Sequence, residues 1–261
     1  MLLTAAACRD PAIDREVLIA FYNTTGGASW QDNTNWLSDK PLREWHGVTT
    51  DDNGRVTELI LIRNNLTGAL PPELGDLTHL TWLNLAHNDL TGPLPPELGR
   101  LTNLMWLNLY RSSLSGPLPM ELTRLTNLRG LILSYNNLAG TLPPELGNLT
   151  KLEMLWLSSL ELTGPVPVEL GQLTNLKELR LDNNRLTGPL PEELGSLTSL
   201  QELWVFNNEL TGPLPQSLTR LMALENFRFR DTELCGLANS AFQAWLLRIT
   251  VLDGKLNCTL P

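Results

Sequence analysis

Leucine recurs at fixed positions every 24 residues along most of the chain, in the unit LTGPLPPELGxLTxLxxLxLxxNxL. Within one unit, Leu83 and Leu85 are separated by Asn84, the alternation of a short strand with one buried face. So short a strand needs lateral partners, and the equivalent leucines of the adjoining units supply them. The repeat therefore predicts a parallel sheet with one strand per unit and the leucines inside.

Glycine and proline mark the turns between these strands. Glycine relaxes the backbone at a turn, and the proline that follows it after three residues fixes the return path. In one unit, Glu97 to Leu101 are then expected to form a short helical turn. The glycines of this series are Gly68, Gly92, Gly116, Gly140, Gly164, Gly188 and Gly212.

A ladder of asparagines is expected inside the turns. The asparagine of LxxN both donates and accepts, so it can bond backbone groups that the bend leaves open. Serine and threonine can replace part of this bonding where they interrupt the ladder, at Ser112 and Thr232. Leu160 cannot, so we expect a local distortion or a water there, unless the site simply tolerates drift. The ladder consists of Asn64, Asn88, Asn136, Asn184 and Asn208.

Both ends of the repeat array carry segments of a different kind. Helical spacing over Asp14–Tyr22 precedes three tryptophans, and Asp52-Asn53-Gly54 predicts a hairpin turn. A second helix is expected over Ala241–Leu247, as a cover for the last leucines. We divide the chain into residues 1–12 (tail or remnant of an export signal), 13–55 (N-terminal cap), 56–231 (eight repeats) and 232–261 (C-terminal cap).

These residues resemble the leucine-rich repeat family, and the LTGxLP segment resembles its plant-specific subclass, found in receptor-kinase ectodomains and polygalacturonase-inhibiting proteins. The resemblance covers eight units, from about Val56 to Asp231. It implies an α/β repeat solenoid: a right-handed superhelix with a concave parallel sheet, short second strands beside it, and terminal caps. It also implies a binding scaffold without enzymatic activity.

The N-terminal cap resembles that of the same family through Trp45-His46-Gly47-Val48, which matches a W-x-G-V signature. The paired cap cysteines of the plant proteins are missing, and tryptophans stand in their place: Trp30, Trp36 and Trp45. The cap is therefore more similar to bacterial and algal versions.

Charge and hydropathy exclude two classes of function. The formal net charge of −9 would repel nucleic-acid phosphates rather than neutralise them. Glycine, proline or charged residues interrupt every leucine run, so no stretch reaches the roughly 20 apolar residues of a membrane span. The sequence therefore argues against a nucleic-acid partner and against a transmembrane segment.

Motifs of catalysis or metal binding are missing from the local sequence. The histidines, His46, His79 and His87, share no metal-ligand spacing, and Asp51 to Gly54 is better explained as a turn than as a calcium loop. The recurring Pro-Glu-Leu glutamates are expected to be solvated charges at helix starts. We expect no catalytic residue, no metal and no cofactor, and an enzyme is the least favoured interpretation.

Three cysteines bear on the compartment. Cys235 and Cys258 bracket the segment after the last repeat, which suggests either a disulfide in an exported protein or two reduced, buried thiols. Cys8 follows small residues, as at the end of a bacterial lipoprotein signal, but few residues precede it. It belongs either to such a signal or to an ordinary tail. The localisation that we expect is periplasmic or extracellular, with a membrane anchor at Cys8 as one alternative.

Residues beside the buried leucines point to the concave side of the sheet. Trp82 and Trp106 hold the same place in neighbouring units, so we expect them roughly 5 Å apart. The later units add charges to this face, among them Glu178, Arg180, Asp182, Arg228, Arg230 and Asp231. The predicted binding residues are Trp82, Trp106, Tyr110, Tyr135, Trp156, Arg180, Trp204, Phe206 and Arg228.

An exposed aromatic patch typically marks an interface, because Trp and Tyr bury a large area at little entropic cost. The alternative is that the rings stabilise the sheet through cross-strand pairs, worth about 0.2–1 kcal/mol each. We therefore expect a scaffold that binds a protein partner. Two other hypotheses remain: an extrinsic subunit of a membrane-associated complex, and a module whose aromatic rings stack on carbohydrate.

Overall fold

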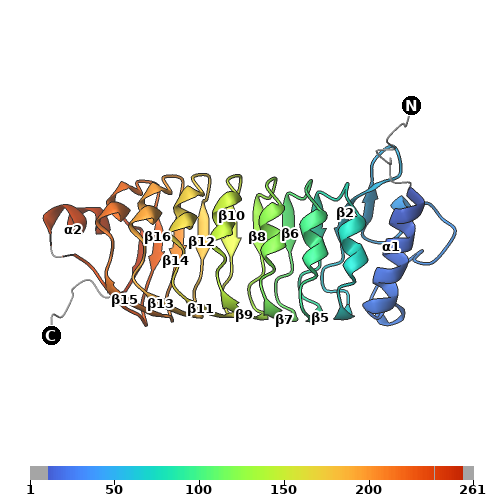
Figure 1. Ribbon diagram of the computed structural model, residues 1–261, viewed down its shortest axis with the longest axis horizontal. Coiled ribbons are helices and arrows are strands. Elements are labelled where there is room, and N and C mark those ends of the chain that lie inside the picture. The colour runs from blue at the N-terminus through green and yellow to red at the C-terminus, as the bar shows by residue number, and fades with distance from the viewer. Residues whose placement is uncertain (1–10, 238, 255–261) are drawn as a thin grey trace, which may run out of the picture.

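The predicted parallel sheet is present and runs along the whole array (Figure 1). The computed structural model describes residues 11–237 and 239–254. The strands of this sheet pair in parallel, except that β1 and β2 are antiparallel. From β2 to β16 the register is 24 residues, with Leu83 between Leu59 and Leu107, and between β16 and β18 it is 25 residues. In spatial order they are β1 (Val48–Thr50), β2 (Val56–Ile60), β4 (Trp82–Asn84), β6 (Trp106–Asn108), β8 (Gly130–Ile132), β10 (Met154–Trp156), β12 (Glu178–Arg180), β14 (Glu202–Trp204), β16 (Asn226–Arg228) and β18 (Val251–Asp253).

The LTGxLP segments form a second parallel sheet on another side of the coil, as the resemblance implied. In every strand of this sheet from β3 to β15 a glycine with positive φ turns the chain, for example Gly92 at 76°. The strands are β3 (Thr67–Ala69), β5 (Asp89–Gly92), β7 (Ser113–Pro117), β9 (Asn137–Thr141), β11 (Glu161–Gly164), β13 (Arg185–Gly188), β15 (Glu209–Pro213) and β17 (Glu233–Cys235).

Short 3-10 helices complete each coil and confirm the expected helical turns. Each follows a proline, which has the extended backbone that starts the turn. Neighbouring turns lie so close that a Cβ on Gly99 would collide with the carbonyl oxygen of Glu121 in the next coil. They are η3 (Pro72–Asp76), η4 (Pro96–Arg100), η5 (Met120–Arg124), η6 (Pro144–Asn148), η7 (Val168–Gln172), η8 (Glu192–Ser196) and η9 (Gln216–Arg220).

The asparagine ladder is confirmed. The Asn184 side chain accepts from the backbone N–H of Leu162 (3.1 Å) and donates to the carbonyls of Leu157 (2.8 Å) and Leu181 (2.9 Å), so it ties three coil segments together. Asn88, Asn136 and Asn208 bond in the same pattern. These side-chain amides are buried, so water cannot satisfy the backbone groups beside them, and the asparagines supply the hydrogen bonds instead.

The interruptions of the ladder behave differently from one another. Thr232 confirms the expectation, because its hydroxyl donates to the Phe229 carbonyl and accepts from the Leu234 N–H. For Ser112 the expectation was wrong: its hydroxyl is buried without a hydrogen-bond partner among the described residues, since its side chain is too short to reach the next coil. At Leu160 the expected distortion of the strands is also not found. The strands β9 and β11 on either side pair in the same register as β13 and β15.

Replacing Ser112 with asparagine is expected to raise the free energy of unfolding by roughly 1–2 kcal/mol. The amide would bond two coils, as Asn88 and Asn136 do on either side. Urea unfolding followed by circular dichroism measures the change. Ser112→Ala is the control, because it removes the unpartnered hydroxyl and adds no bond; equal stabilisation by both variants would contradict the mechanism.

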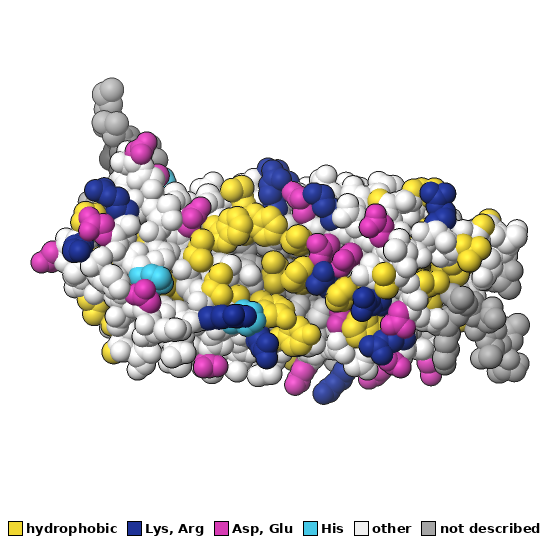
Figure 2. All heavy atoms as spheres, turned by 180° about the vertical axis from the view of Figure 1, so that it is seen from behind, with side chains coloured by type: hydrophobic (Ala, Val, Ile, Leu, Met, Phe, Trp, Pro, Cys, Tyr) yellow, Lys and Arg dark blue, Asp and Glu magenta, His cyan; other side chains and the backbone are white. Residues whose placement is uncertain are grey.

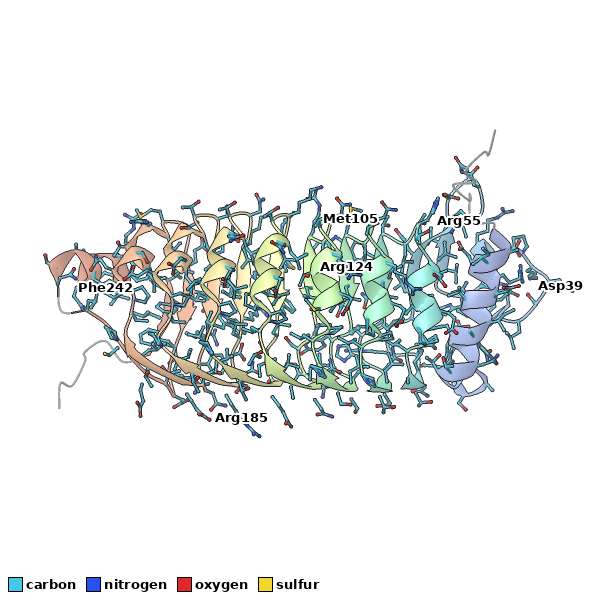
Figure 3. The ribbon with its side chains drawn as sticks, viewed as in Figure 1. Asp39, Arg55, Met105, Arg124, Arg185 and Phe242 are labelled. Carbon is cyan, nitrogen blue, oxygen red and sulfur yellow. The ribbon has the colours of Figure 1, made fainter. Side chains whose placement is uncertain are left out.

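Helices and aromatic residues close the two ends, and Figure 3 labels Arg55 and Phe242 there. At the N-terminus, α1 (Pro11–Thr24), η1 (Gly27–Ser29) and η2 (Leu42–Glu44) precede the predicted hairpin of β1 and β2. Trp36 lies against Trp30 and Trp45, with ring centroids 4.7 and 5.1 Å away. At the other end, α2 (Ser240–Leu246) confirms the expected second helix. Within the described residues, no helix has the length and apolar character needed to cross a membrane.

Candidate functional site

One wall of the concave face is a tryptophan pair. The rings of Trp82 and Trp106 stack with centroids 5.4 Å apart and an interplanar angle of 27°, which confirms the expected spacing. Trp106 lies across Gly130, where any side chain would collide with its ring. The absence of a side chain at Gly130 therefore lets the indole lie flat on the sheet.

Further along, tryptophan and arginine alternate across four strands. The Arg180 guanidinium lies between the rings of Trp156 (4.0 Å) and Trp204 (4.1 Å), and Arg228 covers the Trp204 ring at 4.7 Å. Arg180 also pairs with two carboxylates, Glu178 on its own strand at 2.9 Å and Glu202 on the neighbouring β14 at 2.7 Å. The Trp156 indole N–H donates to Glu178. These side chains therefore hold one another in place, as the stabilising alternative proposed, and the Arg180 charge is neutralised.

The opposite edge carries a second aromatic group. The Tyr110 ring lies 5.2 Å from both the His87 and the Tyr135 rings. Tyr135 is 48% exposed. Tyr110 is partly buried, and this burial raises the pKa of its hydroxyl, with a smaller contribution from Tyr135. Phe206 is set apart, beside Trp204 and under the Arg230 guanidinium.

Between these two edges the face is hollowed. One hollow of about 440 Å³ and another of about 280 Å³ share Tyr110 and Trp156, and together we call them the groove. Figure 2 shows hydrophobic side chains gathered in the middle of this face, with basic and histidine side chains at their border and charges of both signs further along. The groove is lined by Ile62, Arg63, Ala86, His87, Asn108, Tyr110, Ile132, Ser134, Tyr135, Trp156, Ser158, Arg180, Asp182 and Trp204.

A polar line crosses the floor of the smaller hollow. The Ser158 hydroxyl donates to Asp182 (2.6 Å), and the Ser134 hydroxyl accepts from the Ser158 backbone N–H (2.9 Å). Asp182 is only 3% exposed, so the expectation that it adds charge to the open surface was wrong. Burial raises the pKa of its carboxyl, although the bonds from Ser158 and Asn183 oppose the shift.

The residue before the ladder position forms a column at the edge of the groove, here called the corner column. All its members have φ between 51° and 61°, the left-handed region that side chains other than Gly, Asn and Asp enter at a cost of roughly 1–2 kcal/mol. Backbone bonds to the next coil hold this conformation, for example Arg63 N–H to the Ala86 carbonyl (3.0 Å). The column is Arg63, His87, Arg111, Tyr135, Ser159, Asn183, Asn207 and Asp231.

The first three members of this column, Arg63, His87 and Arg111, were not among the predicted site residues. Arg63 and His87 line the groove, and the charges of Arg63 and Arg111 add to partial burial in lowering the pKa of His87. A signal was present in the 24-residue register: the later coils have Asn or Asp at this position, and the early coils do not. His87 had been set aside because it has no metal-ligand spacing.

The remaining predictions concern the cysteines and metal binding. Cys8 and Cys258 lie outside the described residues, so the lipidation and the pairing with Cys235 stay predictions. In the part of the chain that the structure describes, no three His, Cys, Asp or Glu side chains gather in a way that would hold a metal ion.

Comparison with known protein families identifies the family to which the repeats belong. A model described as a leucine-rich repeat region matches residues 112–250, which is more than half of the chain. The chain belongs to the leucine-rich repeat family. A model of the single leucine-rich repeat also matches residues 79–101. The architecture is thus an α/β solenoid, a right-handed leucine-rich-repeat superhelix. No functionally curated protein matches the chain in sequence.

Solved structures of plant receptors are similar to this leucine-rich-repeat chain. A crystal structure of PEPR1 with AtPEP1 is 32% identical with a TM-score of 0.79, over 85% of this chain and 32% of PEPR1. The Arabidopsis receptor kinase HAESA, in complex with the peptide hormone IDA and the co-receptor SERK1, is 33% identical with a TM-score of 0.78, over 96% of this chain and 41% of HAESA. The chain thus spans about a third to two fifths of these receptors.

A third similar structure shows the fold alone. A plant ice-binding protein is 24% identical with a TM-score of 0.59, over 97% of this chain and 100% of that chain. The leucine-rich-repeat ectodomain fold is typically a binding module rather than an enzyme.

Proposed function

We propose that the protein is a non-enzymatic binding scaffold whose groove takes up an extended segment of a partner protein. The observation that carries this proposal is the groove, whose two hollows are both lined by Tyr110 and Trp156. It reaches from the coil of β2 to that of β14, which are six strand spacings or roughly 29 Å apart. An extended segment of roughly eight residues has this length. HAESA, which has a similar fold, was solved with the peptide hormone IDA.

The predicted site residues take different roles in this proposal. Tyr110, Tyr135 and Trp156 are the anchors, because they are rigid, amphipathic and reachable from the groove. The stacked pair of Trp82 and Trp106 lies on the same face and is not among the residues that line the two hollows. Arg180, Trp204, Phe206 and Arg228 form the later end, where their mutual contacts keep the surface rigid before a partner binds.

A random linear peptide library displayed on phage tests the proposal. We expect the wild-type protein to select peptides. The variant Ile132→Lys should bind these peptides roughly tenfold or more weakly, because the change puts an ammonium group in the apolar middle of the groove. Met222→Lys is the matched control, since Met222 is exposed outside the groove. Circular dichroism checks that both variants fold. Peptides that bind Ile132→Lys as well as wild type would place binding elsewhere.

Carbohydrate is the second candidate ligand, and the stacked indoles of Trp82 and Trp106 favour it because sugar rings stack on aromatic faces. A glycan array separates the two candidates. Glycan binding that is lost in Trp82→Ala, together with an empty peptide selection, would favour carbohydrate. The remaining alternative, an extrinsic subunit of a membrane-associated complex, predicts that the protein co-purifies with membranes.

We also propose that the chain is of the plant-specific subclass, in a bacterial- or algal-like form with a tryptophan-rich cap, and that it is exported. The sheet of LTGxLP strands and the buried Trp30, Trp36 and Trp45 support the first part. The similar ectodomain of a plant membrane receptor kinase supports the second. The mass of the mature protein, with and without reductant, reports lipidation at Cys8 and a bridge between Cys235 and Cys258.

A further inference from the structure

We propose that the partner segment carries an Asp or Glu side chain that binds between Arg63, His87 and Arg111 at the rim of the groove, with an apolar neighbour on Ile62 and Ile132. This inference rests on the proposed function and specifies the chemistry of its ligand. It assigns a role to three residues of the corner column that the repeat itself does not require.

The position of these residues favours one ligand that touches both charge and apolar surface. Arg63, His87 and Arg111 stand on successive coils, so neighbouring members are roughly one strand spacing apart. Arg63 and His87 line the same hollow as Ile62 and Ile132, and the His87 ring contacts Tyr110. A carboxylate on the rim thus lies within reach of two guanidinium groups while the residue beside it enters the hollow.

The charges of this group are not used by the fold. Among the described residues, no carboxylate pairs with Arg63 or Arg111, whereas Arg180 and Arg230 on the same face each have acidic partners. The two guanidinium groups are exposed and stand close enough to His87 to disfavour its protonation. In a chain with a formal net charge of −9, an unpaired basic rim complements an acidic partner.

The backbone gives an independent reason to look for a ligand here. Asn183 and Asn207 show which residue suits the left-handed corner, yet the early coils have arginine there. Backbone conformation therefore does not explain Arg63 and Arg111, and neither does an ion pair. The left-handed conformation is common to all members of the corner column, so the feature that favours a ligand is the choice of arginine over asparagine at these two positions. Arginine donates in a fork that matches a carboxylate.

The test is the double variant Arg63→Asn with Arg111→Asn, together with the phage-displayed library. We expect peptides selected by wild type to be rich in Asp or Glu, and to bind the variant at least roughly tenfold more weakly. The melting temperature of the variant should rise, because asparagine suits the left-handed backbone. A loss of binding with a gain in stability distinguishes a lost ligand contact from a damaged fold.

A charge-matched control is the double variant Arg124→Asn with Arg185→Asn. Both residues are exposed on other sides of the coil and are labelled in Figure 3. It should bind like wild type, which excludes a general effect of net charge. Peptides in which Asn replaces the selected Asp should bind wild type and the Arg63/Arg111 variant equally weakly, because the pair of interacting groups is then already broken.

Two results would overturn the inference, and they differ in what they imply for the proposed function. If selected peptides bind the Arg63/Arg111 variant as tightly as wild type, the acidic subsite is wrong and the peptide groove stands. If wild type selects no peptide at all, both fail.

Discussion

Replacing Asp14 with alanine is expected to lower the free energy of unfolding by about 3–5 kcal/mol, the cost of breaking a buried ion pair. Asp14 is fully buried and accepts from Arg55 Nε (3.0 Å), Arg55 Nη2 (2.9 Å) and the Val56 backbone N–H (2.8 Å). Without the carboxylate, the buried Arg55 guanidinium has lost its charge partner. Asp14 joins α1 to the start of β2, so the N-terminal cap should detach first.

Urea unfolding read by tryptophan fluorescence measures this effect, because Trp30, Trp36 and Trp45 report on the cap. The control is the double variant Asp14→Leu with Arg55→Met, which removes both charges and keeps apolar volume; it should be more stable than Asp14→Ala. If Asp14→Ala unfolds within about 1 kcal/mol of wild type, a value ordinary for surface pairs, the ion pair does not hold the cap.

Periodicity made most of the fold predictable, because each coil repeats the same local solution. The positions of Leu83, Gly92 and Asn88 within one unit determine a strand, a turn and a backbone bond, and stacking then determines the sheet. Ser112 shows the limit of this reasoning. The Thr232 hydroxyl bonds backbone groups of its own coil and the Ser112 hydroxyl does not, a difference that the residue type does not contain.

The site was predictable as a face but not as a set of contacts. The register placed Trp82 beside Trp106 correctly, since that pair depends only on strand spacing. It did not predict that Arg180 is held between Trp156 and Trp204, because this depends on side-chain rotamers across three coils. The basic corner was missed for another reason. Its residues are separated by 24 positions in the sequence, and only the structure shows that Arg63 and His87 line the same hollow as Ile62 and Ile132.

Trp156→Ala is expected to weaken peptide binding by roughly 30-fold or more, the loss typical of a central aromatic anchor. Trp156 is shared by both hollows, so its removal interrupts the groove in the middle. It also frees one side of the Arg180 guanidinium and leaves Glu178 without the indole donor, so the surface loses rigidity before the partner arrives. Isothermal titration calorimetry with a library-selected peptide measures the change in affinity.

Trp204→Ala is the matched control for this prediction. It removes the ring on the other side of Arg180 but lines only the smaller hollow, so its effect on affinity should be clearly smaller. Both rings lie on the solvent side of the sheet, away from the leucine core, and the melting temperatures of the two variants should therefore be similar. Equal losses of affinity would mean that the rigid stack around Arg180 binds the partner; a larger loss in Trp156→Ala would locate binding at the junction of the two hollows.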